Sequence, residues 1–205
     1  MASGSPTIAS LPINPVRVRC RYERSPVRFE SPWSGKGQVL RRFGRWRLAM
    51  EWERLTAAQA DAIHTLFEAY GTERSFTIYN PERPLPTGNA SVASMASLKV
   101  AGAGQTGLTL NVDGAPNSTL LFKQGDFIGL ANTGQVFRVA ANCTSNGSGA
   151  ATIALAQYIG ASPADNEDVI VSYVPFRVLL DQDPERAAAG PSIQVSFGVE
   201  MSEWL

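Results

Sequence analysis

The glycine-rich segment Gly102–Gly107 fits the pattern G-x-G-x-x-G, which approaches the phosphates of the ligand in many nucleotide-binding proteins. That chemistry needs a helix directly after the glycines, because the N–H groups at the helix N-terminus bind the pyrophosphate. Here the segment LTLNVDG follows, which predicts a strand and a turn. Kinase glycine loops do lie between strands, but no V-A-I-K, H-R-D or D-F-G motif follows in this chain. We therefore expect a glycine-rich loop that binds no cofactor.

His64 is the only histidine of the chain. A metal site would need Cys or carboxylate partners at a fitting spacing, and the sequence shows none around it. Cys20 and Cys143 are far apart and fit neither a metal-binding nor a redox pattern. A Ser/His/Asp arrangement stays open, although the nucleophile-elbow pattern G-x-S-x-G does not occur. We predict no metal, no catalytic residue and no enzymatic activity; a cell-wall hydrolase is the weakest alternative.

Three acidic residues, Glu51, Glu53 and Asp61, could supply a general acid and a general base if their surroundings separated their pKa values. Glu51 and Glu53 are two positions apart in a predicted strand, so they share one face of it. Their neighbours in the opposite phase are apolar, which makes the glutamate face the wet one. Carboxylates on a solvated sheet face are the simpler interpretation.

Basic charge is concentrated between Arg17 and Arg47, where nine arginines and Lys36 stand against two glutamates, in a chain with a net charge of zero. Such a patch can bind the phosphates of nucleic acids or membranes. However, Arg17, Arg19 and Arg21 alternate with less polar residues, which is typical of the solvent face of a strand. We therefore predict no specific nucleic-acid binding.

Four tryptophans could form a platform that stacks on sugars or bases. Trp46 and Trp52 are in phase with Leu48 in a predicted strand, which favours core packing. Trp33 and Trp204 lie outside regular elements, where an exposed aromatic gains most from a partner chain. The predicted partner interface therefore combines these tryptophans with strand arginines: Arg17, Arg19, Arg21, Trp33, Arg45, Arg47 and Trp204.

One unit of local structure stands out from the rest of the sequence. Thr56 and Gln59 form a capping box, and the apolar stripe behind them predicts a helix over 57–70 that ends at Gly71. It is the only good amphipathic helix pattern. Alternation and turn residues predict strands on both sides of it, at 16–22, 26–30, 37–43, 45–53 and 73–79.

The length of 205 residues and a hydrophobic content of 44% allow one large or two small domains. After Pro81 the composition changes to a proline-, glycine- and serine-rich linker, and short strands at regular spacing then follow up to residue 174. A clean alternation returns at 192–200. We predict a mainly β fold: a β-sandwich with one helix, made of 1–95 and 175–205, and an inserted small β-barrel or OB-like domain, 96–174.

Targeting signals are not evident in the sequence. The first residues, MASGSPTIASLP, lack a charged region and a long apolar run, so we expect no signal peptide. No apolar segment is long enough to cross a bilayer, so no membrane segment is expected.

Several short motifs follow one another in an order that resembles a known family. They are a W-x-L-x-W-like strand (Trp46 to Trp52), L-T-x-x-Q (Leu55, Thr56, Gln59), Phe67, Gly71, F-x-I-Y-N-P (Phe76 to Pro81), Pro86-x-Gly88, V-A-G-A-G-Q-T-G (Val100 to Gly107), L-F-K-Q-G-D-F-I-G-L (Leu121 to Leu130) and the strand end Val199-Glu200. The series, over about residues 40 to 200, resembles the distal tail proteins of bacteriophages with long non-contractile tails and of gene transfer agents.

The resemblance implies a structural virion protein that is made in the host cytoplasm and located in the tail. Proteins of this family form a ring, usually a hexamer, which joins the tail tube to the tail-tip hub or baseplate. The implied partners are therefore other copies of the chain, the tail tube protein and the hub protein, with the tape-measure protein as a further candidate. The alternative is a carbohydrate-binding minor tail protein, or adhesin module, which would use the small β domain and the loose tryptophans.

Overall fold

The computed structural model describes residues 11–24, 27–30, 33, 37–40, 44–183 and 195–204. In these residues the fold is mainly β, with α1 as the single α-helix, and this confirms the predicted mainly β class with one helix. The chain divides into two compact units. Unit 1 consists of Met1–Phe76 and Arg177–Leu205, and unit 2, Thr77–Phe176, is inserted between them.

Unit 1 contains β1 (Arg17–Glu23), β2 (Val27–Glu30), β3 (Gly37–Leu40), β4 (Arg45–Leu55), α1 (Ala57–Glu68) and β15 (Val195–Glu203). The boundaries between the units fall within β5 (Phe76–Tyr79) and β14 (Pro175–Leu180). Unit 2 contains η1 (Ala93–Met95), β6 (Lys99–Val100), β7 (Gly107–Asp113), β8 (Leu120–Phe122), β9 (Phe127–Leu130), β10 (Val136–Arg138), β11 (Cys143–Thr144), β12 (Ala151–Ile159) and β13 (Val169–Ile170).

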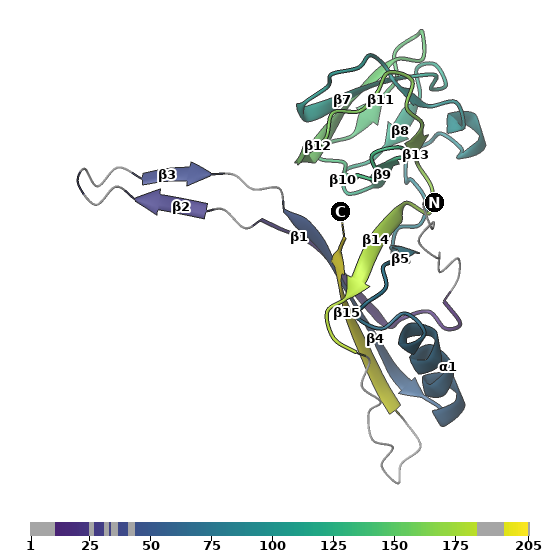
Figure 1. Cartoon of the computed structure of the whole chain (residues 1–205). Coiled ribbons are helices and arrows are strands. Elements are labelled where there is room, and N and C mark those ends of the chain that lie inside the picture. The colour runs from purple at the N-terminus through teal and green to yellow at the C-terminus, as the bar shows by residue number, and fades with distance from the viewer. Residues whose placement is uncertain are drawn as a thin grey trace, which may run out of the picture. The chain divides into compact units, whose positions relative to one another are not determined.

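A five-stranded sheet in the order β1-β4-β15-β14-β5 forms the body of unit 1. The alternating residues Trp46, Leu48, Met50 and Trp52 of β4 are all buried, as predicted. α1 lies beside β4 and β15 (Figure 1). The centroid of its Phe67 ring lies 6.0 Å from that of Trp52 and 6.4 Å from that of Phe197. Aromatic side chains thus join the helix to the buried face of the sheet.

The helix begins as the sequence predicts. Thr56 Oγ1 accepts a hydrogen bond from Gln59 N–H at 3.3 Å, and Gln59 Oε1 accepts one from Thr56 N–H at 2.9 Å. This reciprocal pair satisfies two backbone donors that the first helical turn leaves open. α1 ends at Glu68, and Gly71 follows with a φ of 56°, a conformation that glycine adopts at little cost.

β4 does not keep its alternation to the end. Arg54 has a φ of 57°, and the pairing with β15 shifts from Trp52↔Phe197 to Leu55↔Val195. β4 therefore contains one residue more than β15 in this interval, which is a β-bulge. The extra residue returns Leu55 to the buried side, next to the start of the helix. The sequence pattern alone did not predict this change of phase.

Three small antiparallel sheets build unit 2: β10-β9-β13, β11-β8 and β12-β7-β6. They share one apolar core, to which Leu110 of β7, Ile128 of β9 and Ile153 of β12 contribute fully buried side chains. The segments of short strands that the sequence predicts between 97 and 174 lie in these sheets (Figure 1).

The first domain boundary was predicted at residue 96, but the structure divides the chain at Thr77. Residues 77–95 group with unit 2 because they pack on it. Met95 is buried in the unit 2 core, and Leu120 O accepts hydrogen bonds from Asn89 N–H at 2.7 Å and from Ala90 N–H at 3.1 Å. The proline- and glycine-rich segment that was predicted to be a linker is therefore part of the inserted unit. The second boundary falls after Phe176, two residues beyond the predicted one.

No helix in the described part of the chain is both long and apolar enough to span a membrane.

Candidate interaction surface

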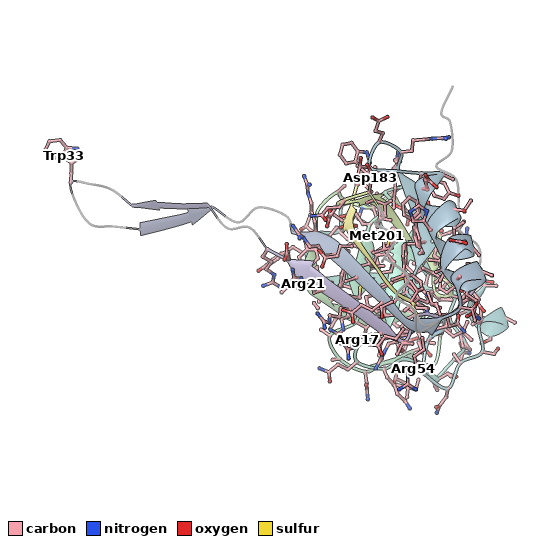
Figure 2. The ribbon with its side chains drawn as sticks, turned by 90° about the horizontal axis from the view of Figure 1, so that it is seen from below. Arg17, Arg21, Trp33, Arg54, Asp183 and Met201 are labelled. Carbon is pink, nitrogen blue, oxygen red and sulfur yellow. The ribbon has the colours of Figure 1, made fainter. Side chains whose placement is uncertain are left out.

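Most of the arginines predicted to form an interface lie on one face of the unit 1 sheet. Register places Arg21 opposite Arg47, and Arg17 opposite Glu51, across the β1–β4 pair. Because alternate residues of a strand share a face, these side chains stand on the side away from Trp46. We call this surface the charged face; its residues are Arg17, Arg19, Arg21, Glu23, Arg47, Glu51, Asp181 and Glu200. Figure 2 shows Arg17 and Arg21 along β1.

Carboxylates on the same face pair with these arginines. Glu51 lies 2.9 Å from Arg17 and 3.5 Å from Arg19, and Glu23 lies 2.7 Å from both Arg21 and Arg47. The side chains are well exposed, so each pair contributes only about 0.2–1 kcal/mol to stability. The face carries four arginines and four carboxylates, and therefore no surplus of positive charge for a long polyanion.

A shallow hollow of about 150 Å³ lies on the charged face between Arg19, Arg21, Arg47, Asp181 and Glu200. Pockets for drug-sized ligands typically measure about 300–1,000 Å³. The hollow is thus suited to a side chain of a partner protein and not to a small-molecule substrate.

Trp33 lies between β2 and β3 (Figure 2), and 97% of its surface is exposed. Among the described strands β2 and β3 pair only with each other. Trp204 follows β15 directly, is 48% exposed and donates its backbone N–H to Arg177 O at 2.8 Å. Both tryptophans are exposed, as predicted, but neither belongs to the charged face.

Arg45, the remaining predicted interface residue, is exposed at the start of β4. Its charge acts on Glu203, a buried carboxylate at the end of β15. Burial raises the pKa of Glu203, while the hydrogen bond from Trp46 N–H and the charge of Arg45 work in the opposite direction. Glu203 was not among the residues predicted from the sequence. It stands in the same phase as the inward residues Val199 and Met201, and extending the alternation of β15 would have found it.

Two contacts of Tyr22 join the end of β1 to residues at the beginning of β4. Tyr22 Oη accepts a hydrogen bond from Gly44 N–H at 2.9 Å, and the Tyr22 ring stands edge-on to Trp46 at 5.3 Å. Burial is also the main cause of a raised pKa at Tyr22. Gly44 has no room for a side chain, because an added Cβ would collide with Glu23 O.

The glycine loop forms its own hydrogen bonds. Gln105 Nε2 donates to Ala101 O at 2.9 Å, and Gln105 Oε1 accepts from Asn111 N–H, so this side chain fills the loop. The Gly102 N–H, which a phosphate would use, donates to Asp165 Oδ1 at 2.8 Å. A bound phosphate would face this carboxylate, and the strand β7 follows where a nucleotide site requires a helix. The geometry therefore does not suit a phosphate cradle.

The other candidates for chemistry stay apart. His64 Nδ1 lies 3.4 Å from Glu68 Oε2 on the same helix, and Glu51 is engaged by arginines of the charged face. Cys143 is buried, donates its thiol to Thr152 O at 3.5 Å and has a pKa raised by burial, which disfavours a reactive thiolate. In the described ranges no three His, Cys, Asp or Glu residues gather as metal ligands would.

A scan of protein-family models gave no match to this chain, and a search of curated proteins gave none either.

Proposed function

We propose that the chain is a structural ring protein of a bacteriophage tail tip, which joins the tail tube to the hub or baseplate through contacts with copies of itself and with these neighbours. The ring would be a hexamer located in the virion tail. The order of the motifs along the sequence supports this function, and some of these motifs contact each other in the fold.

Two of the motifs meet in unit 2. Asp126, within L-F-K-Q-G-D-F-I-G-L, is fully buried. Its carboxylate accepts hydrogen bonds from Thr87 N–H at 2.9 Å and Thr87 Oγ1 at 2.8 Å, where Thr87 is the central residue of Pro86-x-Gly88. A Cβ at Gly88 would collide with Leu121 O, so this glycine allows the two segments to touch. These contacts give both motifs a structural role in the same part of unit 2.

The observation that carries the proposal is the free edge beside the charged face. β1 is the outermost strand of its sheet, and its outer edge has no partner among the described strands. An open strand edge is a ready docking site for another chain. The mixed charges next to it suit a contact with a protein surface that has a mixture of its own. A closed ring needs two different surfaces on each copy, and the sheet offers a second edge at β5.

The experiment is a mass measurement of the purified protein by sedimentation, with two single variants of equal charge change. Arg21→Glu alters the charged face, and the fold should persist because the new carboxylate faces Arg47 across the strands. Arg74→Glu alters an exposed residue of unit 1 outside that face. We expect a closed oligomer for the wild type and Arg74→Glu, and smaller species for Arg21→Glu. A wild-type protein that stays monomeric at high concentration and does not join purified tails would refute the proposal.

A carbohydrate-binding module is the second candidate, and one feature of unit 2 favours it. Tyr173 has a φ of 45°, is 54% exposed and meets Tyr79 edge-on at 5.1 Å. Strained residues of this kind cluster at ligand-binding sites, and an exposed aromatic ring can stack on a sugar. Glycan-array binding that is lost in both Trp33→Ala and Tyr173→Ala would favour this function. Unaltered binding in both variants, or no binding by the wild type, would remove it.

A further inference from the structure

The turn between β8 and β9 collects most of the positive charge of unit 2. Residues 77–176 contain four basic side chains, namely Arg83, Lys99, Lys123 and Arg138. Lys99 pairs with Asp168 at 3.2 Å. Lys123 begins the turn Lys123-Gln124-Gly125, and the side chains of Arg83 and Arg138 reach this turn at Gly125. We call these three residues with Gln124 and Gly125 the basic turn.

Both guanidinium groups lie over Gly125. A Cβ at this residue would be 3.0 Å from Arg83 Nη1 and 3.5 Å from Arg138 Nη2. Gly125 has a φ of 95°, so the position favours glycine for its backbone as well, and the missing side chain leaves the space in which the two arginines converge. Two like charges at one spot repel each other unless an opposite charge lies between them.

Of the two guanidinium groups, only that of Arg83 has a carboxylate beside it among the described residues. Arg83 Nη1 donates to Asp126 Oδ1 at 3.3 Å and to Gln124 O at 3.4 Å. Arg138 donates its backbone N–H to Gln157 Oε1 at 2.9 Å. Within the described part of the chain its guanidinium group makes no hydrogen bond or ion pair, and its side chain is exposed. The basic turn therefore offers a fork of unused donors to an anion.

A hollow of about 400 Å³ lies beside these donors, lined by Gln124, Arg138, Val139, Ala140 and Ala156. Its volume is within the range of small-molecule sites. Arg138 brings the only charged side chain to the lining, and the alanines and Val139 leave room next to it. The hollow can thus hold a group attached to an anion that Arg138 binds.

We propose that the basic turn binds a phosphate group, either as free phosphate or as the phosphate of a small ester or polymer such as glycerol phosphate. Arginine forks match the geometry of phosphate oxygens. The six carboxylates of unit 2 oppose continuous contact along a rigid polyanion such as duplex DNA and favour a local contact with one phosphate group, whether free or part of a larger ligand. This site does not depend on the assembly of the chain into a ring.

Equilibrium dialysis of the full chain against radiolabelled inorganic phosphate, at constant ionic strength in sodium chloride, tests the site whatever the oligomeric state. We expect one phosphate per chain and a loss of affinity of about tenfold or more in Arg138→Ala, because charged hydrogen bonds are lost. Lys99→Ala is the matched control, since it removes one half-buried cation of the same unit away from the turn, and it should bind as the wild type does.

Competition by glycerol phosphate and by poly(glycerol phosphate) then distinguishes the source. Competition by inorganic phosphate alone identifies free phosphate, and stronger competition per phosphate by the ester or the polymer identifies the larger ligand. The proposal is overturned if chloride abolishes binding, if Arg138→Ala binds phosphate as well as the wild type, or if duplex DNA binds where inorganic phosphate does not.

Discussion

Glu203 Oε2 accepts a hydrogen bond from the backbone N–H of Trp46 at 3.0 Å, across 157 positions of the sequence. Glu203 is 5% exposed and Trp46 is 1% exposed, so no solvent replaces this bond if it is lost. The contact ties the end of β15 to the beginning of β4. Glu203 is thus an ionisable side chain on the buried side of the unit 1 sheet.

Removing this acceptor should destabilise unit 1. Glu203→Ala leaves the Trp46 N–H buried without a partner, which costs about 1–3 kcal/mol. Glu203→Gln retains an oxygen acceptor and should lose less. Urea unfolding followed by tryptophan fluorescence measures both, and equal stability of the wild type and Glu203→Ala would contradict the role given to the bond.

The stability of unit 1 should depend on pH through the same residue. Burial raises the pKa of Glu203 above its ordinary value of 4.5, so the folded state holds this proton more tightly than the unfolded state. The contribution is complete below pH 4.5 and is lost as the pH rises through the folded pKa. The free energy of unfolding of the wild type, relative to that of Glu203→Gln, should therefore fall on raising the pH across this window. A difference that rises or stays flat would show that burial does not control this carboxyl.

Gly44 should tolerate no side chain. In Gly44→Ala the new Cβ would lie 2.6 Å from the Tyr22 ring and would collide with the backbone oxygen of Glu23, which cannot move aside without shifting β1. We expect a loss of about 1–3 kcal/mol, as for other overpacked sites. Gly147→Ala is the control, because an added Cβ there meets no atom within 4 Å. Thermal unfolding followed by circular dichroism should show a lower Tm for Gly44→Ala alone.

Asp126 should hold residues 80–88 against the rest of unit 2. Its carboxylate accepts hydrogen bonds from Thr87, Arg83 and Lys123, so Asp126→Ala leaves several donors without an acceptor and should cost at least about 2 kcal/mol. We expect faster proteolytic cleavage between residues 80 and 91. Asp113→Ala, which removes an exposed carboxylate of the same unit, should leave the cleavage rate unchanged. Equal rates in both variants would assign the order of this segment to other contacts.

Local patterns predicted the elements that depend on near neighbours. The capping box at Thr56 and Gln59 predicts the beginning of α1 because both partners lie within one turn of the chain. The buried phase of Trp46 to Trp52 follows from strand alternation alone. The exposure of Trp33 and Trp204 was predicted in the same way, from their places outside regular patterns.

Contacts between distant residues were decided by the tertiary structure. The sequence shows arginines on β1, but only the pairing of β1 with β4 brings Glu23 to Arg47 and Glu51 to Arg17. The structure divides the chain at Thr77, whereas the sequence predicted a boundary at residue 96. The prediction took the proline- and glycine-rich segment for a linker, but these residues are also typical of tightly packed turns.

A mainly β chain with one helix could be predicted from local patterns, because strand alternation and helix capping depend on residues a few positions apart. Three contacts became evident only once the chain was folded: Glu203 is buried against Trp46, Asp126 accepts hydrogen bonds from Thr87, and Arg83 and Arg138 converge over Gly125. Trp46 and Glu203 are 157 positions apart, and Thr87 and Asp126 are 39 positions apart. Arg138 reaches Gly125 from 13 positions away. The formation of these contacts depends on how strands pair and on which surfaces lose water, and no local pattern encodes either.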